Sequence, residues 1–155
     1  RTLEAVRAVH PYEEMAYDLF PLEQPNPTVG TGVIGVLSEP EETMAFLRRV
    51  ADRFGVKALR YSAPCRERIG TVALCGGSGA SFAKEAIRQG ADIYLSGDFK
   101  YHDFAGADNR IILADIGHFE SELCTINIFY DIIRENFPNF AIYKRNVNCN
   151  PVNYL

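Results

Sequence analysis

The sequence has few cysteines, and their spacing excludes a disulfide-stapled fold. Only four occur among 155 residues, and no two of them form a C-x-x-C pair. A disulfide framework needs a higher density of cysteines in a shorter chain. The pattern is instead typical of reduced thiols in a cytoplasmic protein. The four are Cys65, Cys75, Cys124 and Cys149.

Long apolar runs and clusters of basic residues are also absent. No uninterrupted apolar stretch approaches the roughly 20 residues that cross a bilayer, and no signal-peptide pattern opens the chain. The chain has 16 Lys and Arg against 20 Asp and Glu, which gives a formal net charge of −4. Since non-specific binding to nucleic acid or to an anionic membrane depends on positive charge, neither partner is expected.

What the chain does have is the composition of a globular domain, with 47% hydrophobic and 23% charged residues. A chain of this length buries a core without disulfides. Three prolines and two glycines lie between Pro21 and Gly32 and indicate a linker. We therefore predict that residues 1–25 are the tail of another element, 26–32 a linker, and 33–155 the main domain. Because the chain begins at Arg1 without a methionine, we expect it to be a piece of a longer protein.

Short apolar runs alternate with segments of helical periodicity from Val33 onward. This alternation is typical of an α/β domain with a largely parallel sheet flanked by helices. A capping-box pattern at Ser38 and Glu41 predicts a helix that ends at Gly55. Apolar residues from Phe119 to Phe137 recur every three or four positions and predict one long helix with a wide buried face. The predicted strands are 33–37, 57–61, 71–75, 92–95, 110–115 and 140–144.

Polar and glycine-rich segments follow three of the predicted strands. They are Cys75–Gly79, Ser96–His102 and Asp115–Glu122. In open α/β sheets, the ligand crevice forms at the carboxyl ends of the strands. If these strands are parallel neighbours, the three segments converge on one site.

The sharpest candidate pair within these segments is His118 and Glu122. At positions i and i+4 of a helix, an imidazole and a carboxylate point the same way and can share a metal ion. The positive end of the helix dipole favours the neutral imidazole that binds metal. Two ligands do not complete a zinc-type centre, which needs about three from the protein. A simple His–Glu hydrogen bond therefore remains the competing interpretation.

The other two segments also allow two interpretations each. Asp98, Lys100 and His102 form either a solvated turn or an acid/base and anion-holding cluster, since a histidine titrates near neutral pH. The Cys75–Gly79 loop forms either a backbone nest for an anion or a close contact between strand and helix. The loop lacks the full spacing of a nucleotide-binding motif.

Four motifs, in order, closely resemble those of the dinuclear-metal-centre hexameric family, the relatives of NGG-one-interacting factor three. Members are often named GTP cyclohydrolase one type two homologues. The motifs are His10–Asp18 (HPYEEMAYD), Ser96–His102 (SGDFKYH), Asp115–Glu122 (DIGHFESE) and Asn148–Tyr154 (NCNPVNY).

The resemblance implies two related α/β halves, often separated by a PII-like inserted domain. On this chain, HPYEE resembles the end of the insert and the residues from about Gly30 resemble the second half. His118 and Glu122 fall on the metal ligands of that half, whereas His102, with Asp98 and Lys100, falls on residues lining the same cavity. The ligands of the first half lie outside these residues, so we expect this piece alone to retain little or no metal.

The same resemblance implies two divalent ions in the complete protein, either zinc, iron, manganese or cobalt, since histidine and carboxylate ligands suit all four. It also implies a toroidal homohexamer. Two functions fit these ligands. The complete protein is either a metal-dependent hydrolase acting on a nucleotide ring, or a non-catalytic metal-binding scaffold, metallochaperone or regulatory protein.

Overall fold

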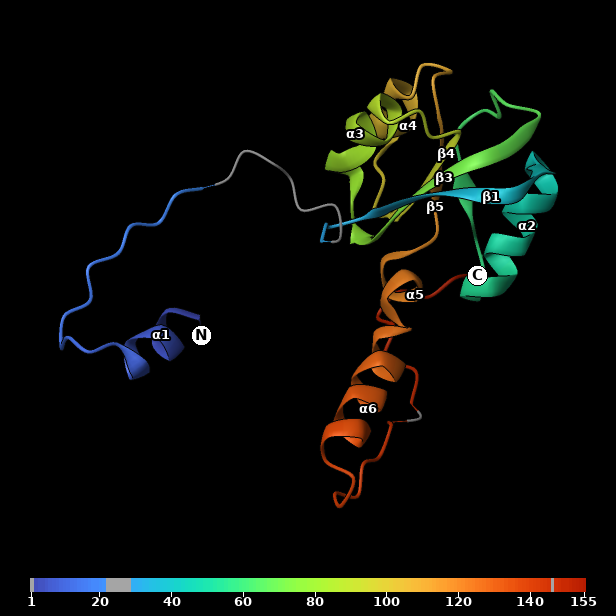
Figure 1. The fold of residues 1–155 in the computed structure, drawn as a ribbon. Helices are drawn as coiled ribbons and strands as arrows, with labels where there is room; N and C mark the ends of the chain where they lie inside the picture. Colours follow the sequence, from blue (N-terminus) through green and yellow to red (C-terminus); the bar gives the residue numbers. More distant parts are fainter. Residues whose placement is uncertain (1, 22–28, 146) are drawn as a thin grey trace. The chain divides into compact units, whose positions relative to one another are not determined.

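The computed structural model describes residues 2–21, 29–145 and 147–155, and the chain divides into two compact units, Arg1–Gly30 and Thr31–Leu155. The division falls within the segment predicted as a linker, of which residues 26–28 lie outside the described ranges. In the first unit, helix α1 (Thr2–Val9) is followed by irregular backbone (Figure 1). Arg7 donates a hydrogen bond of 3.4 Å to the hydroxyl of Tyr17.

The second unit is built on a five-stranded sheet in the order β1-β3-β4-β5-β2 (Figure 1). The strands β3, β4 and β5 are parallel to one another, whereas β1 and β2 pair antiparallel at the two edges. The predicted α/β class is confirmed, with parallel pairing confined to the centre of the sheet. The strands are β1 (Val33–Glu42), β2 (Arg60–Tyr61), β3 (Arg68–Ser78), β4 (Ile93–Gly97) and β5 (Ile112–Asp115).

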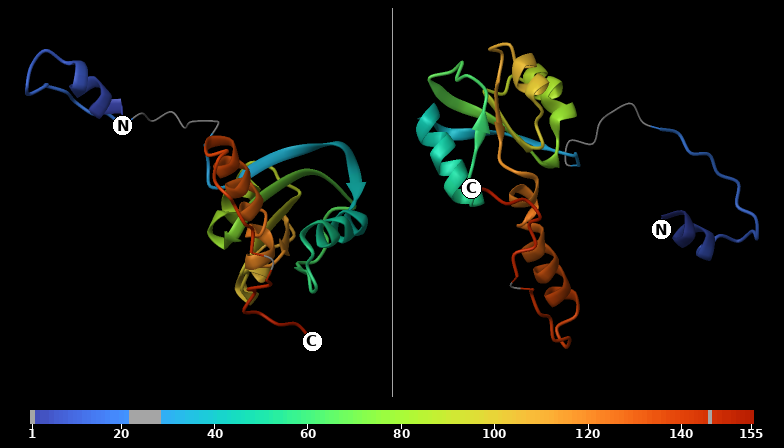
Figure 2. Two further views of the ribbon diagram at one scale, coloured as in Figure 1. Left: turned by 90° about the horizontal axis from the view of Figure 1, so that it is seen from below. Right: turned by 180° about the vertical axis from the view of Figure 1, so that it is seen from behind.

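Helices cover both faces of this sheet (Figure 2). Since successive strand residues point to opposite faces, Ile93 and Leu95 join one hydrophobic cluster and Tyr94 joins the other. Phe46 of α2 packs in the first cluster, and Ala86 of α3 packs in the second. These helices are α2 (Thr43–Phe54), α3 (Ala83–Arg88), which follows the short 3₁₀ turn η1 (Ala80–Phe82), and α4 (Tyr101–Gly106).

Helix α2 begins later than the sequence predicts. Strand β1 runs through the expected capping box to Glu42. The Glu42 carboxylate then accepts hydrogen bonds from the N–H groups of Met44 and Ala45, at 2.9 and 2.7 Å, and caps the helix. These bonds lower the pKa of Glu42. The predicted end at Gly55 is confirmed, because this glycine adopts the left-handed conformation with φ 66°.

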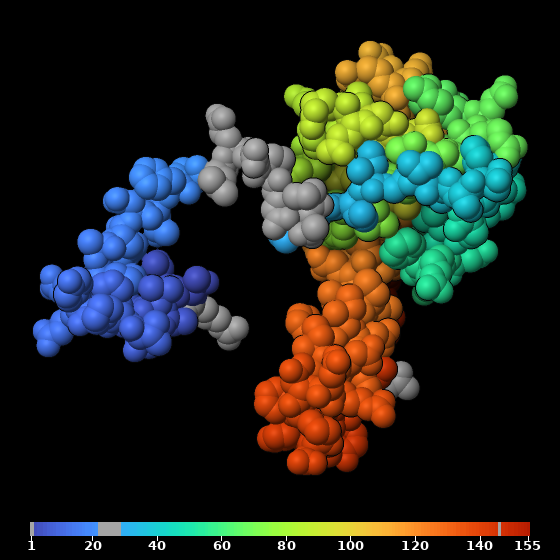
Figure 3. Space-filling view, viewed as in Figure 1, coloured from blue at the N-terminus to red at the C-terminus, as the bar shows by residue number. Residues whose placement is uncertain are grey.

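The predicted long helix over 119–137 is wrong in two respects. It is divided into α5 (His118–Glu122) and α6 (Thr125–Asn136), and α6 buries none of its residues. Helix α6 stands out from the body of the second unit (Figure 3). Its apolar stripe remains exposed, with Phe129 63% accessible. The periodicity predicts an apolar helix face correctly but contains no information on what covers it.

The predicted strand over 140–144 is irregular backbone in the structure. Lys144 of this segment lies 3.1 Å from the side-chain oxygen of Asn127 and 4.5 Å from the ring centre of Tyr130. The segment thus runs back along α6 instead of joining the sheet. No helix in the described part of the chain has the length and apolar character to span a membrane.

Ile112, a fully buried residue of the inner strand β5, provides a test of this core. We expect Ile112→Ala to lower the free energy of unfolding by about 2–5 kcal/mol, because it removes buried methylene groups and leaves a cavity. The matched control is Val36→Ala in β1, which is 80% exposed and should change the value by less than about 0.5 kcal/mol. Chemical denaturation of both variants measures the difference, and equal effects would contradict the assignment of this core.

Candidate metal site

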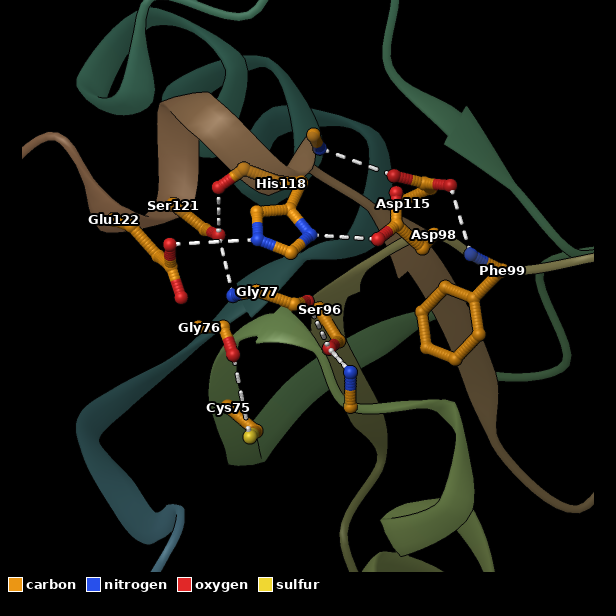
Figure 4. A network of polar contacts seen from close by, with 12 residues as sticks. Cys75, Gly76, Gly77, Ser96, Asp98, Phe99, Asp115, His118, Ser121 and Glu122 are labelled. Atoms are coloured by element: carbon orange, nitrogen blue, oxygen red, sulfur yellow. Dashed lines mark hydrogen bonds and ion pairs between the residues drawn. The ribbon is translucent and has the colours of Figure 1, made fainter.

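The three polar segments begin within the last residues of β3, β4 and β5, and they meet at one end of the sheet, as the sequence predicts (Figure 4). The hydroxyl of Ser121 in α5 accepts a hydrogen bond of 2.8 Å from the N–H of Gly77, at the end of β3. The hydroxyl of Ser96 in β4 accepts one of 3.0 Å from the N–H of Gly79. Both serines are buried, so side-chain hydroxyl groups join the three segments inside the protein.

His118, the first residue of α5, lies between two carboxylates (Figure 4). Its Nδ1 is 2.6 Å from Oδ2 of Asp98, and its Nε2 is 3.4 Å from Oε2 of Glu122. An ionised carboxylate only accepts hydrogen bonds, so the shorter contact places the proton of the neutral imidazole on Nδ1. The lone pair of Nε2 then faces Glu122.

The two carboxylates raise the pKa of His118, with the hydrogen bond to Asp98 as the largest cause. Burial acts in the opposite direction. The expectation that the helix end favours the neutral imidazole is therefore outweighed, since α5 is only 5 residues long and Asp98 is in direct contact.

Glycines allow the backbones of β3, β4 and α5 to approach one another closely at this site. A Cβ on Gly97 would lie 2.8 Å from the backbone nitrogen of His118 and 2.9 Å from the carbonyl oxygen of Gly77. A Cβ on Gly77, which has φ 66°, would lie 2.5 Å from Oε1 of Glu122. Because most of these neighbours are backbone atoms, only residues without a side chain let β3, β4 and α5 meet here.

The Cys75–Gly79 segment, predicted as a loop, belongs to strand β3 as far as Ser78, and it packs against α5 and β4. Two of its N–H groups bond the hydroxyl groups of Ser121 and Ser96, and Cys75 is buried. These bonds favour the interpretation as a close contact over the interpretation as an anion nest.

Asp115 and Arg60 belong to the same end of the sheet but were not predicted as site residues. The buried carboxylate of Asp115 accepts hydrogen bonds from the N–H groups of Phe99 and Gly117, at 3.1 and 3.0 Å, and pairs with the guanidinium of Arg60. The position of Asp115 at the start of a predicted polar segment was visible in the sequence. No pattern in the sequence pointed to Arg60.

A pocket of about 760 Å³ opens beside His118 and Glu122, a volume typical of small-molecule sites. The segment after residue 147 supplies one of its walls, and Asn150 donates a hydrogen bond of 2.9 Å to Glu120 of α5. Burial is the main cause that raises the pKa of Tyr154 in this wall. The lining residues are Ala58, Arg60, Asp98, Asp115, Gly117–Glu120, Glu122, Leu123, Ile126, Asn150–Val152 and Tyr154.

Of the five predicted site residues, the structure brings together Asp98, His118 and Glu122. Lys100 and His102 lie at the start of α4, and neither lines the pocket. The backbone N–H of Lys100 bonds Asp103 at 2.7 Å, and the ring of His102 lies 5.5 Å from that of Tyr101. A role for Lys100 and His102 in binding or proton transfer stays a prediction.

His118 and Glu122 are the residues of this site that could hold a divalent metal ion. Asp98 orients the imidazole through Nδ1, as carboxylates do for many metal-bound histidines. Nε2 of His118 and the Glu122 carboxylate, 3.4 Å apart, are the two atoms that could both face such an ion. Within the described ranges, no three His, Cys, Asp or Glu side chains gather as a complete ligand set. Any further ligands would have to come from residues other than Asp98, His118 and Glu122.

Comparisons with known proteins cover nearly the whole chain. The family model Duf34/NIF3 (NGG1p interacting factor 3) matches residues 2–151. A protein of Halalkalibacterium halodurans named "GTP cyclohydrolase 1 type 2 homolog" is 38% identical over 102 residues, which are 66% of this chain and 27% of that protein. The Bacillus subtilis protein of the same name is 35% identical over 124 residues, 78% of this chain and 33% of that protein.

Solved structures give the same picture. A Bacillus cereus protein related to NIF3 matches with a TM-score of 0.74 and 28% identity, over 99% of this chain and 43% of its own. A Staphylococcus aureus protein matches in fold, with a TM-score of 0.75 and 23% identity, over 99% of this chain and 51% of its own. This chain therefore spans about half the length of these solved structures or less, and about a third of the two named relatives.

Gly97 tests the close approach of the backbones. We expect Gly97→Ala to lower the free energy of unfolding by about 1–3 kcal/mol, because the added methyl group meets backbone atoms. Gly106→Ala is the matched control, since its Cβ would have no neighbour within 4 Å. That variant should raise the free energy of unfolding by about 0.4–1 kcal/mol. Thermal or chemical denaturation measures both. If Gly97→Ala stabilised the protein, this result would contradict the close contact of Gly97 with the backbones of Gly77 and His118.

Asp98 tests the electrostatics. We expect Asp98→Asn to lower the pKa of His118 toward its ordinary value in the metal-free chain, because it removes the negatively charged acceptor at Nδ1. Glu122→Gln, at the longer distance, should lower this pKa by less. An NMR titration of the His118 ring measures both variants, and a larger fall for Glu122→Gln would contradict the assignment of Asp98 as the main cause.

Proposed function

Because the chain belongs to the Duf34/NIF3 (NGG1p interacting factor 3) family, we propose that it contributes His118 and Glu122 to a divalent-metal site. The observation that carries the proposal is the orientation of His118. Asp98 holds Nδ1 at 2.6 Å, which leaves Nε2 directed at Glu122, 3.4 Å away. A surface hydrogen bond between His118 and Glu122 alone would not need a second carboxylate on the far side of the ring.

The complete protein, in this proposal, is a metal-dependent hydrolase that acts on a nucleotide ring. A divalent ion at His118 and Glu122 would supply polarisation of a substrate oxygen and activation of water near neutral pH. The chain's own residues hold the imidazole in one tautomer and one direction. The apolar lining beside Phe119 and Leu123 would exclude bulk water from a bound ring.

Several finer features extend the proposal to the longer protein. It would hold two divalent ions, of zinc, iron, manganese or cobalt, with the remaining ligands supplied by the part absent from this chain. It would self-associate as a hexamer in the cytoplasm, without nucleic acid or membrane as a partner. A non-catalytic metal scaffold or metallochaperone uses the same ligands and differs only in turnover.

Metal content tests the ligand assignment. We expect a version extended upstream to the length of the relatives to bind metal stoichiometrically, whereas the present chain retains little, since two ligands are too few for a stable centre. In the extended version, His118→Ala and Glu122→Gln should lower metal content strongly. Glu85→Gln is the control, because this half-exposed glutamate of α3 does not line the pocket. Elemental analysis after dialysis measures the content.

Equal metal content in both lengths would show that this chain suffices, and full content in His118→Ala would contradict the ligand assignment. Turnover separates the two functions. If the extended, metal-loaded protein hydrolyses neither GTP nor related nucleotide rings, the hydrolase proposal fails and the scaffold function stands.

A further inference from the structure

Asp115 has a role that metal ligation does not explain. It is the last residue of β5 and is only 5% exposed, and its carboxylate bonds Arg60, Phe99 and Gly117 instead of His118 or Glu122. Its Oδ2 accepts the N–H of Phe99 at 3.1 Å, and its Oδ1 accepts the N–H of Gly117 at 3.0 Å. One carboxylate therefore ties the segment after β4 to the segment after β5.

Arg60 completes this connection from the edge of the sheet. Strand β2 has only 2 residues, and its register places Arg60 opposite Asp115. The guanidinium pairs with Oδ2 of Asp115 and also donates a hydrogen bond of 3.0 Å to the carbonyl oxygen of Phe99. The N–H and the carbonyl group of Phe99 are thus both held by the Arg60–Asp115 pair.

The residues that the pair holds flank the two partners of the 2.6 Å contact. Asp98 precedes Phe99 and adopts φ 59°, a left-handed conformation that is uncommon for residues with a Cβ, although aspartate adopts it more readily than most. On the other side, Gly117 precedes His118 and adopts φ 79°. Fixing Phe99 and Gly117 therefore fixes where the Asp98 carboxylate and the His118 ring meet.

We propose that Asp115 and Arg60 are positioning residues, which hold the Asp98 carboxylate against Nδ1 of His118 and thereby direct Nε2 toward the ligand position. The link to metal binding rests on the proposed function above. The effect on the orientation of His118 does not rest on that function, because it depends only on contacts among this chain's own residues.

The tautomer of His118 is the measurement that a merely stabilising role would not change. At a pH where the ring is neutral, long-range ¹H–¹⁵N NMR distinguishes a proton on Nδ1 from one on Nε2. The parent chain should hold the proton on Nδ1. In Arg60→Met, the Nδ1–H to Nε2–H ratio should fall severalfold, because Asp98 is no longer held in place. Arg60→Lys, which keeps the charge, should restore part of the ratio.

Arg49→Met is the matched control, because Arg49 has a similar exposure, 55% against 59% for Arg60, and also pairs with a carboxylate, that of Glu41. It should leave the tautomer ratio of His118 unchanged.

Asp115→Asn, which keeps the shape of the side chain, should lower the ratio as Arg60→Met does. Denaturation curves identify any variant that fails to fold, and Arg60→Met then carries the test alone or with Arg60→Lys.

An unchanged ratio in folded Arg60→Met would overturn the proposal, and so would an equal fall in Arg49→Met. In the extended, metal-binding protein, Arg60→Met should weaken metal affinity about 10-fold. This effect is typical of residues that do not bind the metal but hold its ligands in position. If the tautomer shifts as expected while the extended protein binds no metal at all, the proposed function fails and the positioning role stands.

Discussion

The close approach of three backbones at Gly97 is the constraint on which the site depends. The end of β4 lies so near the carbonyl group of Gly77 and the nitrogen of His118 that a Cβ at this position would approach both to within 3 Å. Because the three segments are this close, short buried hydroxyl groups such as that of Ser121 can bridge them. Longer side chains are then free to point outward into the pocket. Backbone packing thus determines the geometry that the polar side chains use.

The polar contacts at the site orient side chains more than they stabilise the fold. His118, Asp98 and Glu122 are each about half exposed, at 49%, 50% and 53% of their side-chain surface. Ion pairs with this exposure contribute little to stability, since water competes for the charges and salt screens them. Asp115 differs, because its side chain is 7% exposed and its carboxylate is held by three donor groups. The buried carboxylate fixes the backbone, and the exposed carboxylates direct the imidazole.

The sequence alone predicts the features that are encoded locally. Strand and helix periodicity predicts the α/β class, and the spacing of His118 and Glu122 predicts that they share one side of α5. Pairings between distant segments escape such reasoning. Arg60 lies in a strand of 2 residues, too short for any periodic pattern, and only the sheet register brings it to Asp115. The exposure of α6 escapes it for a related reason, because an apolar stripe looks the same whether or not a partner covers it.

The contacts that orient His118 and Glu122 lie within this chain. Their positions follow from a glycine contact, a left-handed residue at Asp98 and a buried carboxylate, all formed within residues 31–155. Ligands that are already ordered lose less conformational entropy on binding, so each contributes more to affinity. If the proposed metal site is shared between this chain and a second segment, each set of ligands would be ordered independently, and bringing the segments together would complete a site instead of building one.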